Sequence, residues 1–167
     1  MNKIKRISLM TAIFLTVALV SSAVEAEVIR INGTIAGSEI DTPFPNPGEG
    51  IYVNGSVTST DTQLGPFTMF YSVPVLFAFL GMHPGDTGGS RLINANDDSI
   101  LTWFQSLGNN PDSCATGDLN IVSRDTIVGG TGRYAGARGS FTMDRCVNLM
   151  TGETSGTISG TIVVRGH

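Results

Sequence analysis

Residues 126–141 read Thr-Ile-Val-Gly-Gly-Thr-Gly-Arg-Tyr-Ala-Gly-Ala-Arg-Gly-Ser-Phe. A β-branched run stops at two glycines, three more glycines follow, and a strand-like run begins again at Ser140. Glycine adopts tight backbone conformations with positive φ that a Cβ forbids. The stretch therefore predicts a strand, a compact wide turn and a returning strand. The residues expected to shape the turn are Gly129, Gly130, Gly132, Gly136 and Gly139.

The rest of the chain repeats this alternation of short apolar runs with Gly, Pro, Asn and Asp, which is typical of strands and turns. Strands are expected at residues 28–32, 50–60, 67–73, 99–104, 119–128, 139–147 and 154–164. Residues 41–50 hold three prolines and are expected to form a loop outside any sheet. Without long helices or βαβ units, seven or eight short strands predict an all-β barrel or sandwich.

The first 26 residues have the features of a secretory signal peptide. A basic segment, residues 1–6, precedes an apolar segment, residues 7–20, and small residues lead up to Ala26. The pattern predicts cleavage after Ala26 and export to the periplasm or the extracellular space. The alternative, an uncleaved membrane anchor, needs a longer apolar segment. Residues 27–167 are then expected to form a single β-barrel domain with no membrane span.

Charge and composition argue against several kinds of partner. After residue 26 the chain has seven arginines, no lysine and thirteen acidic residues, so nucleic acid is not expected as a partner. His83 and His167 are the two histidines, and no metal site is expected. Gly130–Ala135 fits G-x-G-x-x-A, but Gly136 and Gly139 prevent the long helix that a dinucleotide site needs. No cofactor is expected.

The two cysteines, Cys114 and Cys146, form an even set in a chain that is predicted to be exported. This predicts a disulfide that closes a loop of about 32 residues and contributes roughly 3–4 kcal/mol on the chain-entropy model. The alternative is a reactive thiol, but no histidine lies near either cysteine in the sequence.

Two charged dipeptides flank the glycine-rich turn, Arg124-Asp125 before it and Asp144-Arg145 after it. Neighbouring residues of a strand point to opposite faces, so each strand is expected to send one charge inward and one outward. One hairpin register opposes Arg124 and Asp144, and another opposes Asp125 and Arg145. We favour a salt bridge on the outer face, worth about 0–1 kcal/mol. The alternative is a carboxylate and a guanidinium inside the barrel, with a shifted pKa and a role in proton transfer.

Residues 67–82 are the most apolar stretch after the signal peptide. Alternation predicts that Phe67, Met69, Tyr71 and Val73 share one face of a strand. We favour a strand ending near Pro74, followed by a short apolar strand or helical turn in the core. The alternative is that the surplus apolar residues cover a cavity mouth or a subunit contact.

Residues 127–134, followed by Ala137-Arg138-Gly139, resemble the strand–turn–strand signature of the dirigent proteins and the related allene oxide cyclase barrels. The resemblance implies an eight-stranded antiparallel β-barrel whose cofactor-free cavity holds an apolar molecule in one conformation during a coupling or cyclisation. It places Arg138 at the barrel mouth as a candidate catalytic residue. It also implies a homodimer or homotrimer, with residues 67–80 as the candidate contact.

Together these observations predict an exported barrel that binds an apolar small molecule and steers a cofactor-free cyclisation or coupling. The candidate catalytic residues are Arg138 and Asp125. Two alternatives stay open: a carrier barrel without chemistry, and a structural or interaction protein of the cell envelope whose interior is filled with side chains.

Overall fold

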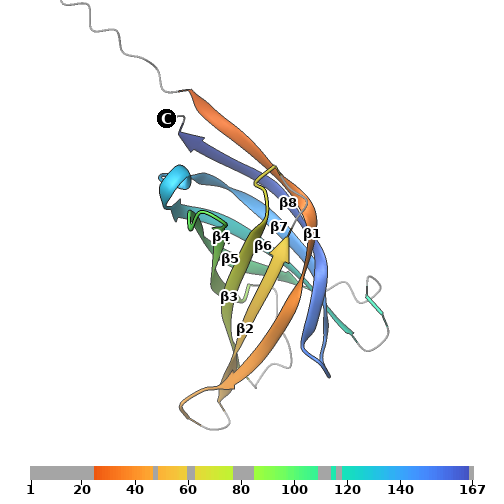
Figure 1. Ribbon diagram of the computed structural model, residues 1–167. Helices are drawn as coiled ribbons and strands as arrows, with labels where there is room; N and C mark the ends of the chain where they lie inside the picture. The colour runs from red at the N-terminus through yellow and green to blue at the C-terminus, as the bar shows by residue number, and fades with distance from the viewer. Residues whose placement is uncertain are drawn as a thin grey trace, which may run out of the picture.

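Eight antiparallel strands pair in chain order, and the eighth pairs with the first, so the sheet closes into a barrel (Figure 1). The computed structural model describes residues 25–46, 49–59, 63–76, 85–108, 114–115 and 118–165. The strands are β1 (Ala26–Pro43), β2 (Gly50–Ser59), β3 (Phe67–Leu76), β4 (Thr87–Asn94), β5 (Ser99–Gly108), β6 (Asp118–Gly130), β7 (Arg138–Asn148) and β8 (Glu153–Arg165). A short 3₁₀ turn, η2 (Gly132–Tyr134), joins β6 to β7. The predicted all-β, eight-stranded antiparallel barrel is confirmed.

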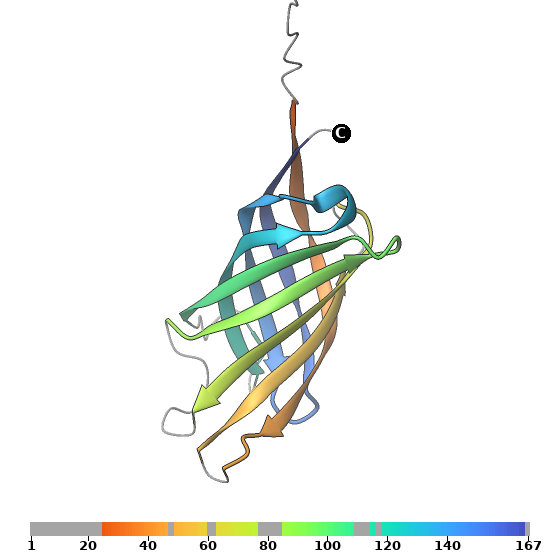
Figure 2. The ribbon, with the colours of Figure 1, turned by 90° about the vertical axis from the view of Figure 1, so that its left-hand side faces the viewer.

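The two ends of the barrel differ. The carboxyl ends of β1, β3, β5 and β7 lie at one end, which we call the mouth end. The carboxyl ends of the other four strands lie at the opposite end, together with η2 and the start of β1 (Figure 2). β1 begins at Ala26, which pairs with Arg165 of β8. Residues 1–24, and with them most of the predicted signal peptide, lie outside the described residues.

The glycine-rich hairpin has the predicted strand–turn–strand form. Gly132, Gly136 and Gly139 have φ values of 56°, 72° and 133°, in the region that glycine adopts readily. At Gly139 a Cβ would also run into the carbonyl oxygen of Thr161 on β8. Gly129 and Gly130 instead end strand β6 without a positive φ. The wide turn therefore comes from the last three glycines.

β1 is longer than predicted, because it runs to Pro43 rather than ending near residue 32. Its first part pairs with β8 and its second part with β2, so one long strand bridges two neighbours. The predicted loop at residues 41–50 is therefore shorter, since Pro43 still pairs with Ile51 at the strand end. Sequence alternation missed this extension because its inward positions are a glycine and carboxylates, Gly37, Glu39 and Asp41, rather than apolar residues.

Two further strands differ from expectation. β3 continues past Pro74, which pairs with Tyr52 on β2. Proline is tolerated here because β4 pairs with β3 only as far as Ser72 in the described residues, so the missing N–H breaks no ladder on that side. β4 was not predicted, since its Gly88-Gly89 start has low strand propensity. Residues 77–84, the second half of the apolar stretch, lie outside the described residues.

Side chains of alternate residues fill much of the barrel interior. The predicted inward face of β3 is confirmed, because Phe67, Met69, Tyr71 and Val73 are all buried. They pack in one cluster with apolar residues of the other strands, among them Ile31, Leu92, Ile100, Phe141, Ile158 and Ile162. In the described part of the chain, no helix is long and apolar enough to cross a membrane.

Candidate functional site

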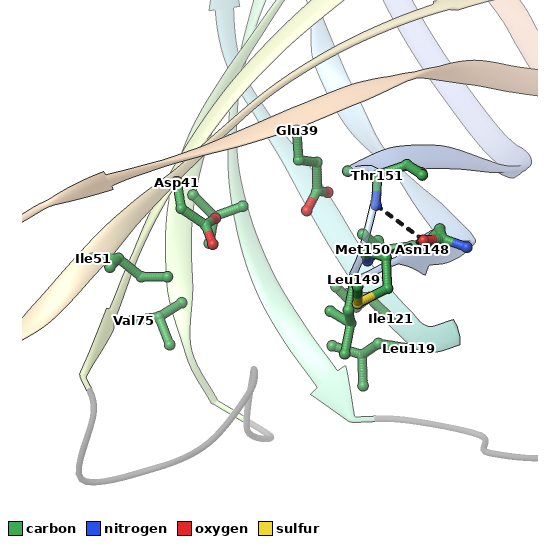
Figure 3. A pocket seen from close by; sticks show the side chains of 13 residues that line it. Glu39, Asp41, Ile51, Val75, Leu119, Ile121, Asn148, Leu149, Met150 and Thr151 are labelled. Carbon is green, nitrogen blue, oxygen red and sulfur yellow. Dashed lines mark hydrogen bonds between the residues drawn. The ribbon is translucent and has the colours of Figure 1, made fainter. Parts of the chain in front are cut away.

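A cavity of about 380 Å³ opens at the mouth end of the barrel. Its walls are mainly apolar side chains: Ile51, Val53, Val75, Leu119, Ile121, Val147, Leu149 and Met150. Its polar side chains are Glu39 and Asp41 of β1, Asn148 at the end of β7 and Thr151 of the β7–β8 turn (Figure 3). Asp41 lies near the end of β1, and Glu39 lies two residues deeper on the same face. The Glu39 carboxylate thus stands where the open cavity meets the packed interior.

Three side chains from three strands form a polar cluster at this inner end. The Tyr71 hydroxyl donates a hydrogen bond of 2.5 Å to Oε1 of Glu39. Nη1 of Arg145 forms an ion pair with the same oxygen and donates to the Tyr71 hydroxyl at 3.0 Å. The Arg145 guanidinium also lies 4.7 Å from the centre of the Tyr71 ring, within cation–π range. The carboxylate is therefore held in place by two partners that also contact each other.

Glycines leave the space that these long side chains need. Gly55 of β2 lies between Glu39 of β1 and Tyr71 of β3 in the strand register, and it lets the tyrosine ring cross β2. Gly156 of β8 lies opposite Arg145, where a Cβ would press against the arginine backbone and Cβ. Small residues at these two inward positions allow one carboxylate, one phenol and one guanidinium to meet.

Burial changes the acid–base properties of this cluster. Burial raises the pKa of Tyr71 above its ordinary value, so its hydroxyl stays protonated and donates to Glu39. Burial lowers the pKa of Arg145 to about 9, which still leaves the guanidinium charged at neutral pH. The side chains of Arg145 and Glu39 are only 2% and 8% exposed. Chemically, the cluster combines a carboxylate acceptor, a hydroxyl donor and a fixed positive charge beside apolar walls.

Asp125 belongs to a second, deeper cluster. Its side chain is fully buried and accepts hydrogen bonds from Thr102 at 2.7 Å, Ser90 at 3.1 Å and Ser123 at 3.4 Å. Burial raises the pKa of Asp125 to about 6, although the three hydroxyl donors stabilise the ionised form and oppose the shift. Asp125 is not among the residues that line the cavity. It is enclosed in the barrel, away from any molecule bound at the mouth.

The register of β6 and β7 corrects the favoured interpretation of the charged dipeptides. Arg124 lies opposite Thr142, and Asp144 lies opposite Val122, so the expected salt bridge on the outer face does not form. Asp144 instead accepts a hydrogen bond of 2.7 Å from Asn120. The glycine-rich turn joins the strands in a register that differs from both expected ones.

In that register Asp125 and Arg145 both face the interior, at different levels of the barrel. Asp125 lies opposite Phe141, whereas Arg145 lies opposite Ile121. The alternative is therefore correct in that a carboxylate and a guanidinium both lie inside the barrel, but they belong to two separate clusters. Arg145 finds its carboxylate partner on β1 rather than on β6.

Arg138 lies at the start of β7, at the end opposite the mouth. It is exposed, and alternation along β7 places it on the outer wall with Ser140, because Phe141 and Met143 are the buried positions. The structure therefore brings neither Arg138 nor Asp125 to the cavity. Glu39, which lines the cavity, and Tyr71, which donates to it, were not singled out from the sequence, although the alternation of β3 placed Tyr71 on the inner face.

The predicted disulfide between Cys114 and Cys146 is confirmed. Cys146 lies on β7 next to Arg145 and ties the segment before β6 to the barrel wall. Among the described residues, no group of three or more His, Cys, Asp and Glu side chains is arranged to hold a metal ion.

No protein-family model matches the chain, and no curated protein matches it. Among solved structures, the chain is similar to the pterocarpan synthase dirigent protein GePTS1, at 14% sequence identity and a TM-score of 0.42. The alignment covers 86% of this chain and 88% of that chain. The match is to a dirigent protein, the family that residues 127–139 resemble.

Proposed function

We propose that the protein is an exported β-barrel that binds an apolar small molecule in the cavity at its mouth end. The observation that carries this proposal is the cavity itself, about 380 Å³ with mainly apolar walls. Cavities of roughly 300–1,000 Å³ with apolar walls and a few polar groups are typical of small-molecule sites. The disulfide supports export, because disulfides persist in oxidising compartments.

The polar cluster gives the bound molecule an orientation. The Glu39 carboxylate lines the cavity, and Tyr71 and Arg145 hold it from behind. A fixed polar group at one end of an apolar cavity favours ligands with a matching polar group at one end. The apolar body of the ligand then lies against Val75 and Ile121 of the wall.

If the barrel is instead a structural protein filled with side chains, it has no room for a ligand and should bind none. A neutral fluorescent dye, N-phenyl-1-naphthylamine, distinguishes the binding function from this structural role. We expect its fluorescence to rise on saturable binding, and octan-1-ol to displace it. Replacing Ile51→Trp fills part of the cavity and should abolish binding. The matched variant Val128→Trp places the same side chain on the outer wall, where Val128 is 65% exposed, and should bind as wild type does. Equal binding by both variants would contradict the proposed cavity.

A second candidate function is steering a cyclisation or coupling of the bound molecule. The Glu39–Tyr71–Arg145 cluster favours it, because an acceptor, a donor and a positive charge stand together beside apolar walls. Steering requires that a ligand is held in one orientation. We expect one set of intermolecular NOEs from the bound dye to the methyl groups of Val53, Val75 and Ile121. NOEs averaged over several orientations would leave a binding function without steering.

A further inference from the structure

The charged residues of the described chain are distributed unevenly along the barrel axis. Seven acidic residues lie towards the mouth end: Glu39, Asp41, Glu49, Asp86, Asp118, Asp144 and Glu153. The single arginine among the described residues there, Arg145, is already paired with Glu39. At the opposite end, Arg30, Arg133, Arg138 and Arg165 balance Glu25, Glu27, Asp97 and Asp98. The mouth end therefore carries most of the excess negative charge of the described chain.

Two of these carboxylates, Glu39 and Asp41, line the cavity (Figure 3). Within the described residues, both side-chain contacts of Glu39 use Oε1, so Oε2 is left for a ligand. The other polar side chains of the wall accept from neighbouring backbone: Asn148 from the N–H groups of Met150 and Thr151, and Thr151 from that of Glu153. None of the described residues that line the cavity is basic.

We propose that the ligand is an apolar organic cation, such as an amine with a hydrocarbon body. This inference rests on the proposed binding function and names the chemical class that the cavity selects. The charged group lies between Asp41 and Glu39, and the hydrocarbon body lies against Val75, Leu119 and Ile121.

The charges around the cavity favour a cationic ligand over an anionic or a neutral one. A cation that leaves water for an apolar cavity needs a compensating anion, and Asp41 is a carboxylate that Arg145 does not neutralise. An anionic ligand meets repulsion from the acidic mouth end. A neutral ligand gains the apolar contacts without the Coulomb attraction. The field of the acidic mouth also raises the local concentration of cations and speeds their association.

Three probes of equal chain length test the inference: octylammonium, octan-1-ol and octanoate, each titrated by calorimetry at low ionic strength. We expect octylammonium to bind at least about 5-fold more tightly than octan-1-ol, which corresponds to one favourable ion pair. Octanoate should bind most weakly. Asp41→Asn should weaken octylammonium binding about 5-fold and leave the affinity for octan-1-ol unchanged. Glu153→Gln removes the same charge at the same end but outside the cavity wall, and should weaken octylammonium binding much less than Asp41→Asn does.

The outcomes separate this inference from the proposed function. If no probe binds, the binding function itself fails. If octan-1-ol binds as tightly as octylammonium, or if octanoate binds best, binding stands and the cation inference is overturned. Octylammonium binding that survives Ile51→Trp takes place on the outer acidic surface and also overturns it. Loss of the octylammonium advantage in high salt supports the ion pair, because salt screens such attraction.

Discussion

The ring of Tyr71 lies over Gly55, the residue directly opposite it on β2. A Cβ at position 55 would overlap the ring atoms and the hydroxyl of Tyr71. Gly55 in turn lies opposite Glu39 on β1, so the ring crosses one whole strand before its hydroxyl reaches the carboxylate. A glycine in the middle strand is what allows side chains of two non-adjacent strands to meet.

Replacing Gly55→Ala should therefore displace the Tyr71 ring and break its hydrogen bond to Glu39. Overpacking a core costs about 1–3 kcal/mol, and a lost buried hydrogen bond adds about 1 kcal/mol. We expect urea unfolding to show a loss of about 2–4 kcal/mol. The matched control is Gly89→Ala on β4, where a Cβ meets a single atom, the carbonyl oxygen of Thr102, at an ordinary 3.8 Å. Similar stability of both variants would contradict the close packing of ring on glycine.

Removing the negative charge of Glu39 should lower the stability of the fold, because the positive charge of Arg145 then stays buried without a partner. Glu39→Gln leaves Arg145, with a 2% exposed side chain, without its counter-charge. Breaking a buried ion pair in this way typically costs about 3–5 kcal/mol. The double variant Glu39→Gln, Arg145→Met should recover much of that loss, because it removes the orphaned charge as well. If Glu39→Gln is as stable as wild type, Glu39 and Arg145 do not form a buried ion pair.

The buried carboxyl of Asp125 should make stability depend on pH. Its pKa is about 6 in the folded protein, against 3.8 for an ordinary aspartate. Between these values the folded protein keeps a proton that the unfolded chain has lost, so stability falls as the pH rises from 4 to 6. Above that window the ionised group costs up to about 3 kcal/mol.

Asp125→Asn removes this titration, because an amide does not ionise. We expect the variant to lack the fall in stability between pH 4 and 6 and to be more stable than wild type at pH 7.5. Urea unfolding of both proteins from pH 4 to 8 measures the difference. A constant difference over that range would mean that Asp125 titrates as it does in water.

The glycines of the hairpin turn are expected to differ in how well they tolerate alanine. Gly136 has a φ of 72° and open space around it, so Gly136→Ala should cost only the backbone penalty of about 1–2 kcal/mol. Gly139→Ala adds a clash with the carbonyl oxygen of Thr161, a backbone atom that cannot rotate away. Thermal unfolding should rank Gly139→Ala clearly below Gly136→Ala, and the reverse order would contradict the described turn.

The disulfide is expected to stabilise the fold rather than to take part in chemistry. It links residues 32 apart, and the chain-entropy model assigns such a loop about 3–4 kcal/mol. Cys114→Ala, Cys146→Ala should lower stability by about that amount and leave dye binding intact below the new unfolding transition. Loss of dye binding in a protein that is still folded would give the disulfide a role in shaping the cavity.

The strands whose inward residues are apolar, and the turn whose glycines take up positive φ, could be predicted from the amino-acid sequence, because both depend on residues close together in the chain. The sequence also indicated that one charge of each dipeptide faces inward, since alternation is a property of a single strand. It gave no signal for the inward face of β1 beyond Ile35, where Gly37, Glu39 and Asp41 replace apolar residues. It gave none for the register of β6 and β7 either, which depends on how many residues the turn uses.

Which charged side chains meet depends on how the strands are arranged in the barrel. Glu39, Tyr71 and Arg145 are far apart in the sequence and lie on three different strands, and closure of the barrel between β8 and β1 brings them together. Pairing of β4, β5 and β6 gives Asp125 the hydroxyl groups of Ser90, Thr102 and Ser123 as partners. A strand fixes which side a residue faces, whereas its partners depend on strand order and register, which are set by long-range pairing around the whole barrel.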